Sequence, residues 1–167
     1  MPVESLDWLR ADPERWAHVD YVRGVDDDGV PGDVNRSTRE LVLGMLARDH
    51  LPDDAELVRY LLRQEIAAHE ASWGYGDSLG AAALLLVDCG AVEDVWLVWQ
   101  AKNANVDTFI GIDRELLFGA GVAETLEFVR ASDHRDRDEL LEYVNDGVPT
   151  EEDIRALLGW LREYHRF

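Results

Sequence analysis

The chain has 167 residues, enough for one domain or one short repeat array, and 47% of them are hydrophobic. Its 35 acidic side chains outnumber 16 basic ones, and the formal net charge of −19 excludes nucleic acid and anionic lipid as partners and favours a basic protein, although solubility alone also accounts for it. The single cysteine, Cys89, excludes an internal disulfide.

The N-terminal stretch and the apolar runs predict a soluble, cytoplasmic protein. Residues 1–16 carry acids instead of the basic start and apolar segment of a secretion signal. The longest apolar run, Ala81 to Val87, is far shorter than the ~20 residues of a membrane helix.

Helix signals begin near the N-terminus. Asp12 and Pro13 are residue types that cap and open a helix, and Gly24 is expected to end it. The stretch 25–35, rich in Gly, Asp and Pro, is predicted to be irregular. We therefore expect an N-terminal helical pair and an acidic loop over residues 1–35, followed by the rest of one compact domain.

Further helical segments follow, each with apolar residues along one stripe. Capping spacings and glycines mark their boundaries. The expected boundary residues are Ser37 with Glu40, Asp77, Gly90, and Thr150 with Asp153. No segment alternates convincingly as a strand, so the predicted fold class is all-α.

The helices also repeat along the chain. When residues 90–101 are laid over residues 121–131, glycine, glutamate and apolar positions coincide. The matched pairs are Gly90 with Gly121, Glu93 with Glu124, Val95 with Leu126 and Val98 with Val129. Further copies of the second helix begin near Glu56 and, more weakly, near Glu152. Each unit is a helix, a Gly turn and a second helix whose first turn carries the Glu that the helix dipole favours.

A repeat of about 30 residues with two helices per unit is typical of stacked antiparallel helical hairpins. We expect such a short α-solenoid over residues 36–167. The segments "LLFGAGVAETLEFVRAS" and "WQAKNANVDT" resemble the ankyrin-repeat family, in its helix–Gly turn–helix unit and in the connection that follows. The Thr-Pro-Leu-His opening of that family's first helix is absent from both matched units, so a HEAT-like repeat is the alternative.

The repeat register assigns different environments to two neighbouring tryptophans. Trp96 falls on positions that hold Arg59, Glu127 and Arg155 in the other copies, so we expect it to face water unless the N-terminal helices or a long loop cover it. Trp99 falls on mixed positions and is expected to pack. An exposed indole is typical of binding hot spots, so Trp96, Arg59 and Glu127 form the predicted partner-binding surface.

Motifs for catalysis, cofactors or metals are absent from the sequence. The glycine run "GYGDSLG" is too long for a dinucleotide-binding loop and follows no strand. The "DDDG" of residues 26–29 lacks the flanking ligands of a calcium loop, and the histidines lack zinc spacing. Cys89 falls at a helix C-terminus, where the dipole disfavours a thiolate. We therefore assign no catalytic residue, cofactor or metal and expect a protein that is not an enzyme.

One turn offers an alternative site. His69, Trp73, Tyr75 and Asp77 gather aromatic and titratable side chains at a Gly-rich turn, which is the composition of a small-ligand pocket or an active site.

The repeats and the charge favour a non-enzymatic protein–protein interaction module with a protein partner, possibly basic. An immunity or antitoxin protein that masks a basic toxin is one form of this function. Self-association through Trp96 is less favoured, because the charge of −19 opposes it. The alternative from a different class is an enzyme or small-ligand protein with its site at the turn of residues 69–78.

Overall fold

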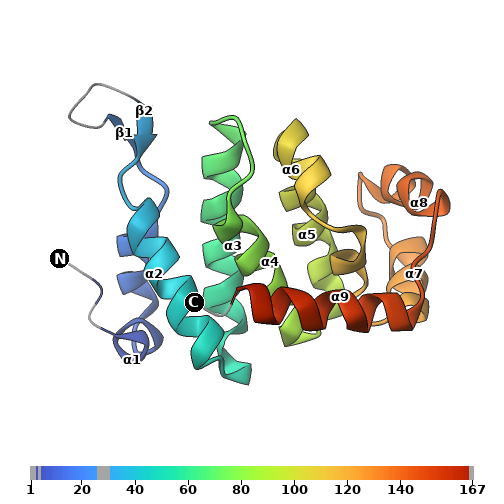
Figure 1. Cartoon of the computed structure of the whole chain (residues 1–167), viewed down its shortest axis with the longest axis horizontal. Coiled ribbons are helices and arrows are strands. Elements are labelled where there is room, and N and C mark those ends of the chain that lie inside the picture. Colours follow the sequence, from blue (N-terminus) through green and yellow to red (C-terminus); the bar gives the residue numbers. More distant parts are fainter. Residues whose placement is uncertain (1–2, 4, 26–30, 166–167) are drawn as a thin grey trace.

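A computed structural model describes residues 3, 5–25 and 31–165, and helix dominates this part of the chain (Figure 1). The prediction of an all-α fold class is confirmed to the extent that the described residues are mostly helical. The prediction of an irregular stretch over residues 25–35 is wrong in part, because β1 (Arg23–Val25) and β2 (Pro31–Asp33) form an antiparallel hairpin. Strands this short cannot show the alternation that reveals a strand in a sequence.

The helices follow in chain order, with short 3₁₀ helices labelled η. The first part of the chain holds α1 (Leu6–Arg10), η1 (Pro13–Val19), α2 (Arg36–Arg48), η2 (Pro52–Asp54) and α3 (Ala55–Glu70). The middle holds α4 (Asp77–Cys89), η3 (Val92–Asp94), α5 (Val95–Lys102), α6 (Val106–Gly111) and η4 (Arg114–Phe118). The last part holds α7 (Val122–Ala131), α8 (Arg137–Asn145) and α9 (Glu151–Tyr164).

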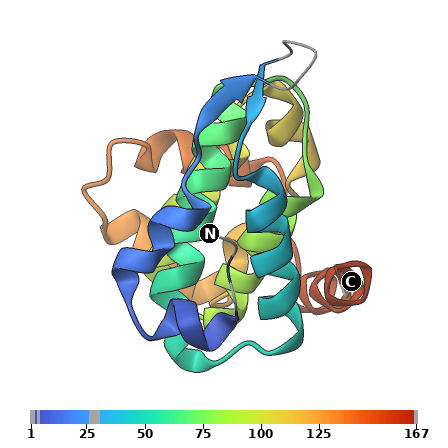
Figure 2. The same ribbon diagram turned by 90° about the vertical axis from the view of Figure 1, so that its left-hand side faces the viewer.

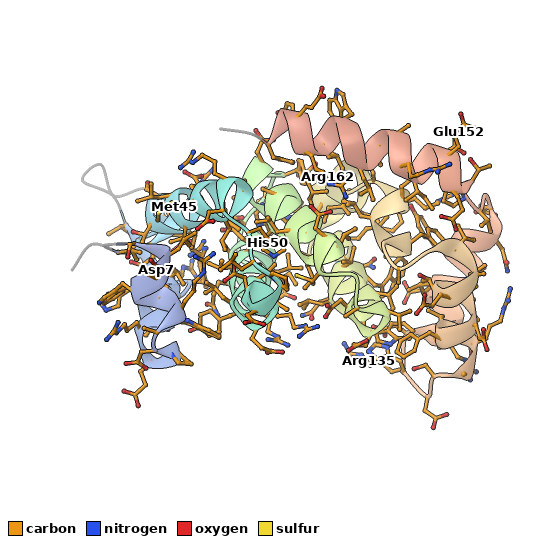
Figure 3. The ribbon with its side chains drawn as sticks, turned by 90° about the horizontal axis from the view of Figure 1, so that it is seen from below. Asp7, Met45, His50, Arg135, Glu152 and Arg162 are labelled. Atoms are coloured by element: carbon orange, nitrogen blue, oxygen red, sulfur yellow. The ribbon has the colours of Figure 1, made fainter. Side chains whose placement is uncertain are left out.

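The helices pack in two rows. In one row α2 contacts α4, and α4 contacts η4; in the other, η1 contacts α3, and α3 contacts α5 (Figure 1). Helix α9 lies crosswise on α4 and η4, beside the two rows when they are viewed from one end (Figure 2). Arg162 lies between α9 and α4, where it forms an ion pair with Asp88 at 2.5 Å (Figure 3).

Several predicted boundaries are confirmed. Asp12 caps η1, Gly90 ends α4 in the left-handed conformation at φ 75°, and Thr150 forms a capping box with Asp153 at α9. These residue types satisfy helix-end groups that would otherwise lack hydrogen bonds, which is why they are visible in a sequence.

Other boundaries lie elsewhere than predicted. Helix η1 ends at Val19 instead of Gly24, and α2 begins after Asn35 instead of at Ser37. Asp33 accounts for the difference, because its Oδ1 accepts the backbone N–H groups of Val22 and Asn35 and so ties the two ends of the hairpin together. Helix α4 begins at Asp77 itself, with Gly76 in the cap position.

The apolar core centres on α4. The run Ala81 to Val87 is buried throughout, because α2, α3, η4 and α9 all contact this helix. A helix that is apolar all round is expected to be enclosed in this way. At Gly119 an added Cβ would lie 2.5 Å from Val87, so only a glycine allows η4 to approach α4 this closely.

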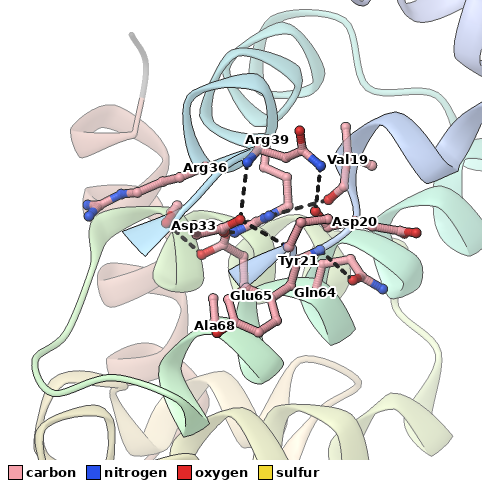
Figure 4. Close-up of polar contacts among 12 residues, drawn as sticks. Val19, Asp20, Tyr21, Asp33, Arg36, Arg39, Gln64, Glu65 and Ala68 are labelled. Atoms are coloured by element: carbon pink, nitrogen blue, oxygen red, sulfur yellow. Dashed lines mark hydrogen bonds and ion pairs between the residues drawn. The ribbon is translucent and has the colours of Figure 1, made fainter. Parts of the chain in front are cut away.

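A charged side chain is buried beside this core. Arg39 of α2 is fully buried and donates from Nε to Glu65 of α3 at 2.7 Å, from Nη1 to the Val19 carbonyl at 3.3 Å, and from Nη2 to Asp33 (Figure 4). Ser78 of α4 donates to the other oxygen of Glu65 at 2.7 Å. This Arg39 network joins the hairpin to α2, α3 and α4 and to the end of η1.

No helix among the described residues is both long and apolar enough to cross a bilayer.

Replacing Arg39 with methionine should lower the free energy of unfolding by about 3–5 kcal/mol, because the buried carboxylate of Glu65 would lose its cation. Urea denaturation followed by circular dichroism measures the change. Arg36→Met is the matched control: Arg36 lies one turn away, and its exposed ion pair with Glu40 at 2.9 Å should be worth no more than about 1 kcal/mol. Equal losses for the two variants would contradict a special role for the buried network.

Candidate functional site

Three segments between the main helices lie at one end of the molecule. The hairpin, the turn of residues 71–76 and α6 all lie at the upper end in Figure 1. On the turn and α6, the three most exposed large apolar side chains are Trp73, at 88%, Ile110, at 77%, and Val106, at 66%. Val106 and Ile110 are four residues apart on α6 and therefore share a face. We call these three residues the end patch.

Hydrogen bonds hold the two segments of the end patch together. The side-chain amide of Asn105 donates to the carbonyls of His69 at 3.0 Å and Gly74 at 3.1 Å. Asp107 in turn accepts the backbone N–H of Gly74 at 2.8 Å. Because Asn105 also caps α6, Trp73 is presented on a turn fastened to the start of that helix.

Tyr75 anchors the other side of the same turn. Its ring packs against Gly80 of α4 and Gly111 of α6, where an added Cβ at Gly111 would lie 2.7 Å from the ring. Burial, reinforced by the negative charges of Asp77 and Asp113, raises the pKa of Tyr75 to about 12. The "GYGDSLG" run thus serves as a turn and a packing site.

The structure brings together three of the four residues of the predicted ligand turn. His69, Trp73 and Tyr75 line a cavity of about 260 Å³, whereas Asp77 lies outside it and accepts a hydrogen bond from Tyr164 at 3.3 Å. The first turn of α4 thus places the Asp77 side chain beside α9, apart from the other three residues.

Both ring nitrogens of His69 make hydrogen bonds to the backbone. Its Nε2 lies 3.0 Å from the backbone N–H of Gly76 and accepts from it, so the ring proton is assigned to Nδ1, which lies 2.8 Å from the Glu65 carbonyl. A histidine bonded in this way orients the turn and has no free nitrogen for proton transfer.

The two tryptophans of α5 differ in burial. Trp99 is buried, as predicted. Trp96 is half-buried instead of exposed, because His134 from the loop after α7 stacks on its indole, with ring centroids 4.0 Å apart and planes inclined by 9°. The repeat register locates Trp96 at the surface but contains no information on this loop.

A groove of about 510 Å³ lies beside Trp96 and is lined by Arg59 and His134 as well. Arg59 is engaged with Asp94 through two bonds of 2.7 and 2.8 Å. Glu127 is exposed but does not line the groove. The structure thus brings together two of the three predicted partner-binding residues, and internal contacts already hold both.

The residues described hold no cluster of three or more His, Cys, Asp or Glu that could bind a metal ion. The "DDDG" stretch of residues 26–29 lies outside the described part of the chain. Cys89 Sγ lies 3.6 Å from His50 Nε2, and burial, together with nearby acids, raises the pKa of its thiol. A raised pKa favours the unreactive thiol over the thiolate.

Sequence reasoning missed Val106 and Ile110. The capping residues Asn105 and Thr108 mark the start of α6 in the sequence, and the apolar residues four apart would have revealed its exposed face. Their proximity to Trp73 could be learned only from the structure.

The sequence matches no protein-family model. Comparison with curated proteins and with solved structures also gives no match. What the end patch and the cavity can bind is therefore inferred from the residues of this chain and their contacts.

Asn105→Ala should loosen the turn of residues 71–76 and lower the free energy of unfolding by about 1–3 kcal/mol, since a helix cap and two turn bonds are lost. Amide hydrogen exchange should become faster in this turn. Asn103→Ala, which removes only an exposed amide bonded to the Trp99 carbonyl, is the matched control. Unchanged exchange at residues 71–76 in Asn105→Ala would contradict the fastening.

Tyr75 should titrate late. Absorbance at alkaline pH, compared between the wild type and Tyr75→Phe, should assign it a pKa of about 12 in the folded protein against 10 for an unperturbed phenol. Because folding holds the phenol protonated, its contribution to stability is present below pH 10 and is lost as the pH rises toward about 12. A Tyr75 transition at the same pH in folded and urea-unfolded protein would rule out this environment.

Proposed function

We propose that the chain is a non-enzymatic protein-binding module, built as a short stack of ankyrin-type helical hairpins, that binds a basic protein through the end patch. The pairs α2–α3, α4–α5 and η4–α7 correspond to the three hairpins. Their contacts along two rows support stacking. The β1–β2 hairpin and the turns at one end of the stack favour an ankyrin-type over a HEAT-like arrangement.

The observation that carries the proposal is the exposure of Trp73 by 88% beside two further exposed apolar residues. An exposed indole on a fastened turn loses little conformational freedom on binding and offers a large apolar area. Clusters of large apolar residues on a protein surface mark interaction sites more often than single exposed residues do.

Charge supports a basic partner. Glu70 and Asp107 are exposed next to the two segments of the end patch, and the whole chain carries −19. A field of one sign steers an oppositely charged protein and disfavours a second copy of the chain. Trp96 and Arg59 are weaker candidates for the contact surface, because His134 and Asp94 already occupy them.

The proposal is tested by capture from a lysate of the source cell with immobilised wild type, Trp73→Ser and Ile110→Ser. A basic partner should be identified by mass spectrometry, and after its purification each variant should bind it at least about tenfold more weakly. The interaction should also weaken as salt is raised from low concentration to about 0.5 M.

Trp160→Ser is the matched control, because Trp160 on α9 is another exposed tryptophan, at 57%, and lies outside the end patch. Trp96→Ala tests the alternative groove in the same assay. A partner that binds Trp73→Ser and Ile110→Ser as tightly as the wild type would exclude the end patch as its docking surface.

A further inference from the structure

A second feature at this end of the molecule is the cavity of about 260 Å³ between the hairpin, the start of α2, the end of α3 and the turn before α4. Its inner wall includes the buried polar residues Arg39, Glu65, His69 and Ser78. The Arg39 network lies at this wall, with Arg39 between Asp33 and Glu65 (Figure 4).

The acceptors at this wall already have donors. Glu65 accepts from Arg39 at one oxygen and from Ser78 at the other. Asp33 accepts from Arg39 at Oδ2 and from the backbone of Val22 and Asn35 at Oδ1. Both carboxylates are therefore poor sites for a cation or a hydrogen-bond donor that enters the cavity.

The wall can instead offer N–H groups that donate hydrogen bonds to a ligand. A guanidinium carries five N–H groups, and the contacts of Arg39 within the described chain engage three acceptors. Two further arginines, Arg23 and Arg36, line the cavity and are exposed. The exposed pair of Arg36 with Glu40 can be exchanged for a ligand at little cost, because surface ion pairs are weak.

Aromatic side chains complete the lining. Tyr21, Trp73 and Tyr75 all border the cavity. Trp73 makes no ring contact with another described residue, and its indole is 88% exposed. Such a ring can stack on a flat ligand. The volume lies below the ~300 Å³ of the smallest drug-sized pockets, so the ligand is compact.

We propose that this cavity binds a small anion that carries a flat ring, with the anionic group held by Arg23, Arg36 and Arg39 and the ring stacked on Trp73. An aromatic carboxylate and a nucleoside monophosphate share this chemistry. The site shares Trp73 with the end patch proposed above, but it also requires the arginines, whereas protein docking also requires Val106 and Ile110.

The proposal is tested by titration calorimetry and by NMR of the full chain with five probes. Indole-3-acetate and uridine monophosphate carry both the ring and the anion. At least one of these two probes should bind and shift the NMR signal of the Trp73 indole. Acetate and inorganic phosphate lack the ring and should bind at least about tenfold more weakly. Tryptamine carries a ring and a cation and should not compete.

Variants locate the binding. The double variant Arg23→Gln/Arg36→Gln should weaken binding of the preferred probe by about tenfold, and Trp73→Ser should remove the preference over the ring-free anion. Arg155→Gln, an exposed arginine of α9, is the matched control and should bind like the wild type. Ile110→Ser should weaken protein capture and leave probe binding intact, which separates this site from the end patch.

Three results would overturn the proposal. They are the absence of binding by both ring-bearing anions at millimolar concentration, tighter binding of tryptamine than of indole-3-acetate, and an Arg23→Gln/Arg36→Gln protein that stays folded by circular dichroism and binds as tightly as Arg155→Gln.

Discussion

The buried guanidinium of Arg39 is the constraint on which the N-terminal half of the structure depends. It takes its acceptors from the hairpin, from α3 and from the end of η1, so all three must be in place before the charge is compensated. A lone buried charge is far more costly than a buried pair, which makes the arrangement cooperative. The same requirement holds the hairpin against α3 and forms the inner wall of the cavity.

Two further arginine–carboxylate pairs link helices near the starts of α3 and α5. Arg10 of α1 binds Asp54 just before α3 through two bonds of 2.8 Å, and Arg59 of α3 binds Asp94 just before α5 in the same way. A planar guanidinium that meets a carboxylate through two bonds fixes orientation as well as distance. Ion pairs thus fix the relative position of these helices at one end, and apolar residues fill the space between the helices.

The sequence predicts local features better than contacts between distant segments. Gly90, Thr150 and Trp99 behave as predicted, because a cap or an apolar stripe depends on neighbouring residues. Arg39 differs little in sequence context from the exposed Arg36, and its buried position depends on partners far along the chain, Glu65 and the Val19 carbonyl. The stacking of His134 on Trp96 and the hydrogen bonds between the Trp73 turn and α6 also join distant segments, so the sequence does not reveal them.

The two proposed sites share one side chain. Trp73 belongs to the end patch and also borders the cavity, so a ring stacked on its indole would remove part of the surface offered to a protein. By thermodynamic linkage, a ligand that lowers the affinity for the partner must have its own affinity lowered by the same factor when the partner is bound. The arginines contribute only to the cavity, and α6 contributes only to the end patch. The coupling between the two sites would therefore act through the Trp73 indole and through the turn that Asn105 holds against α6. A rigid turn would transmit this coupling.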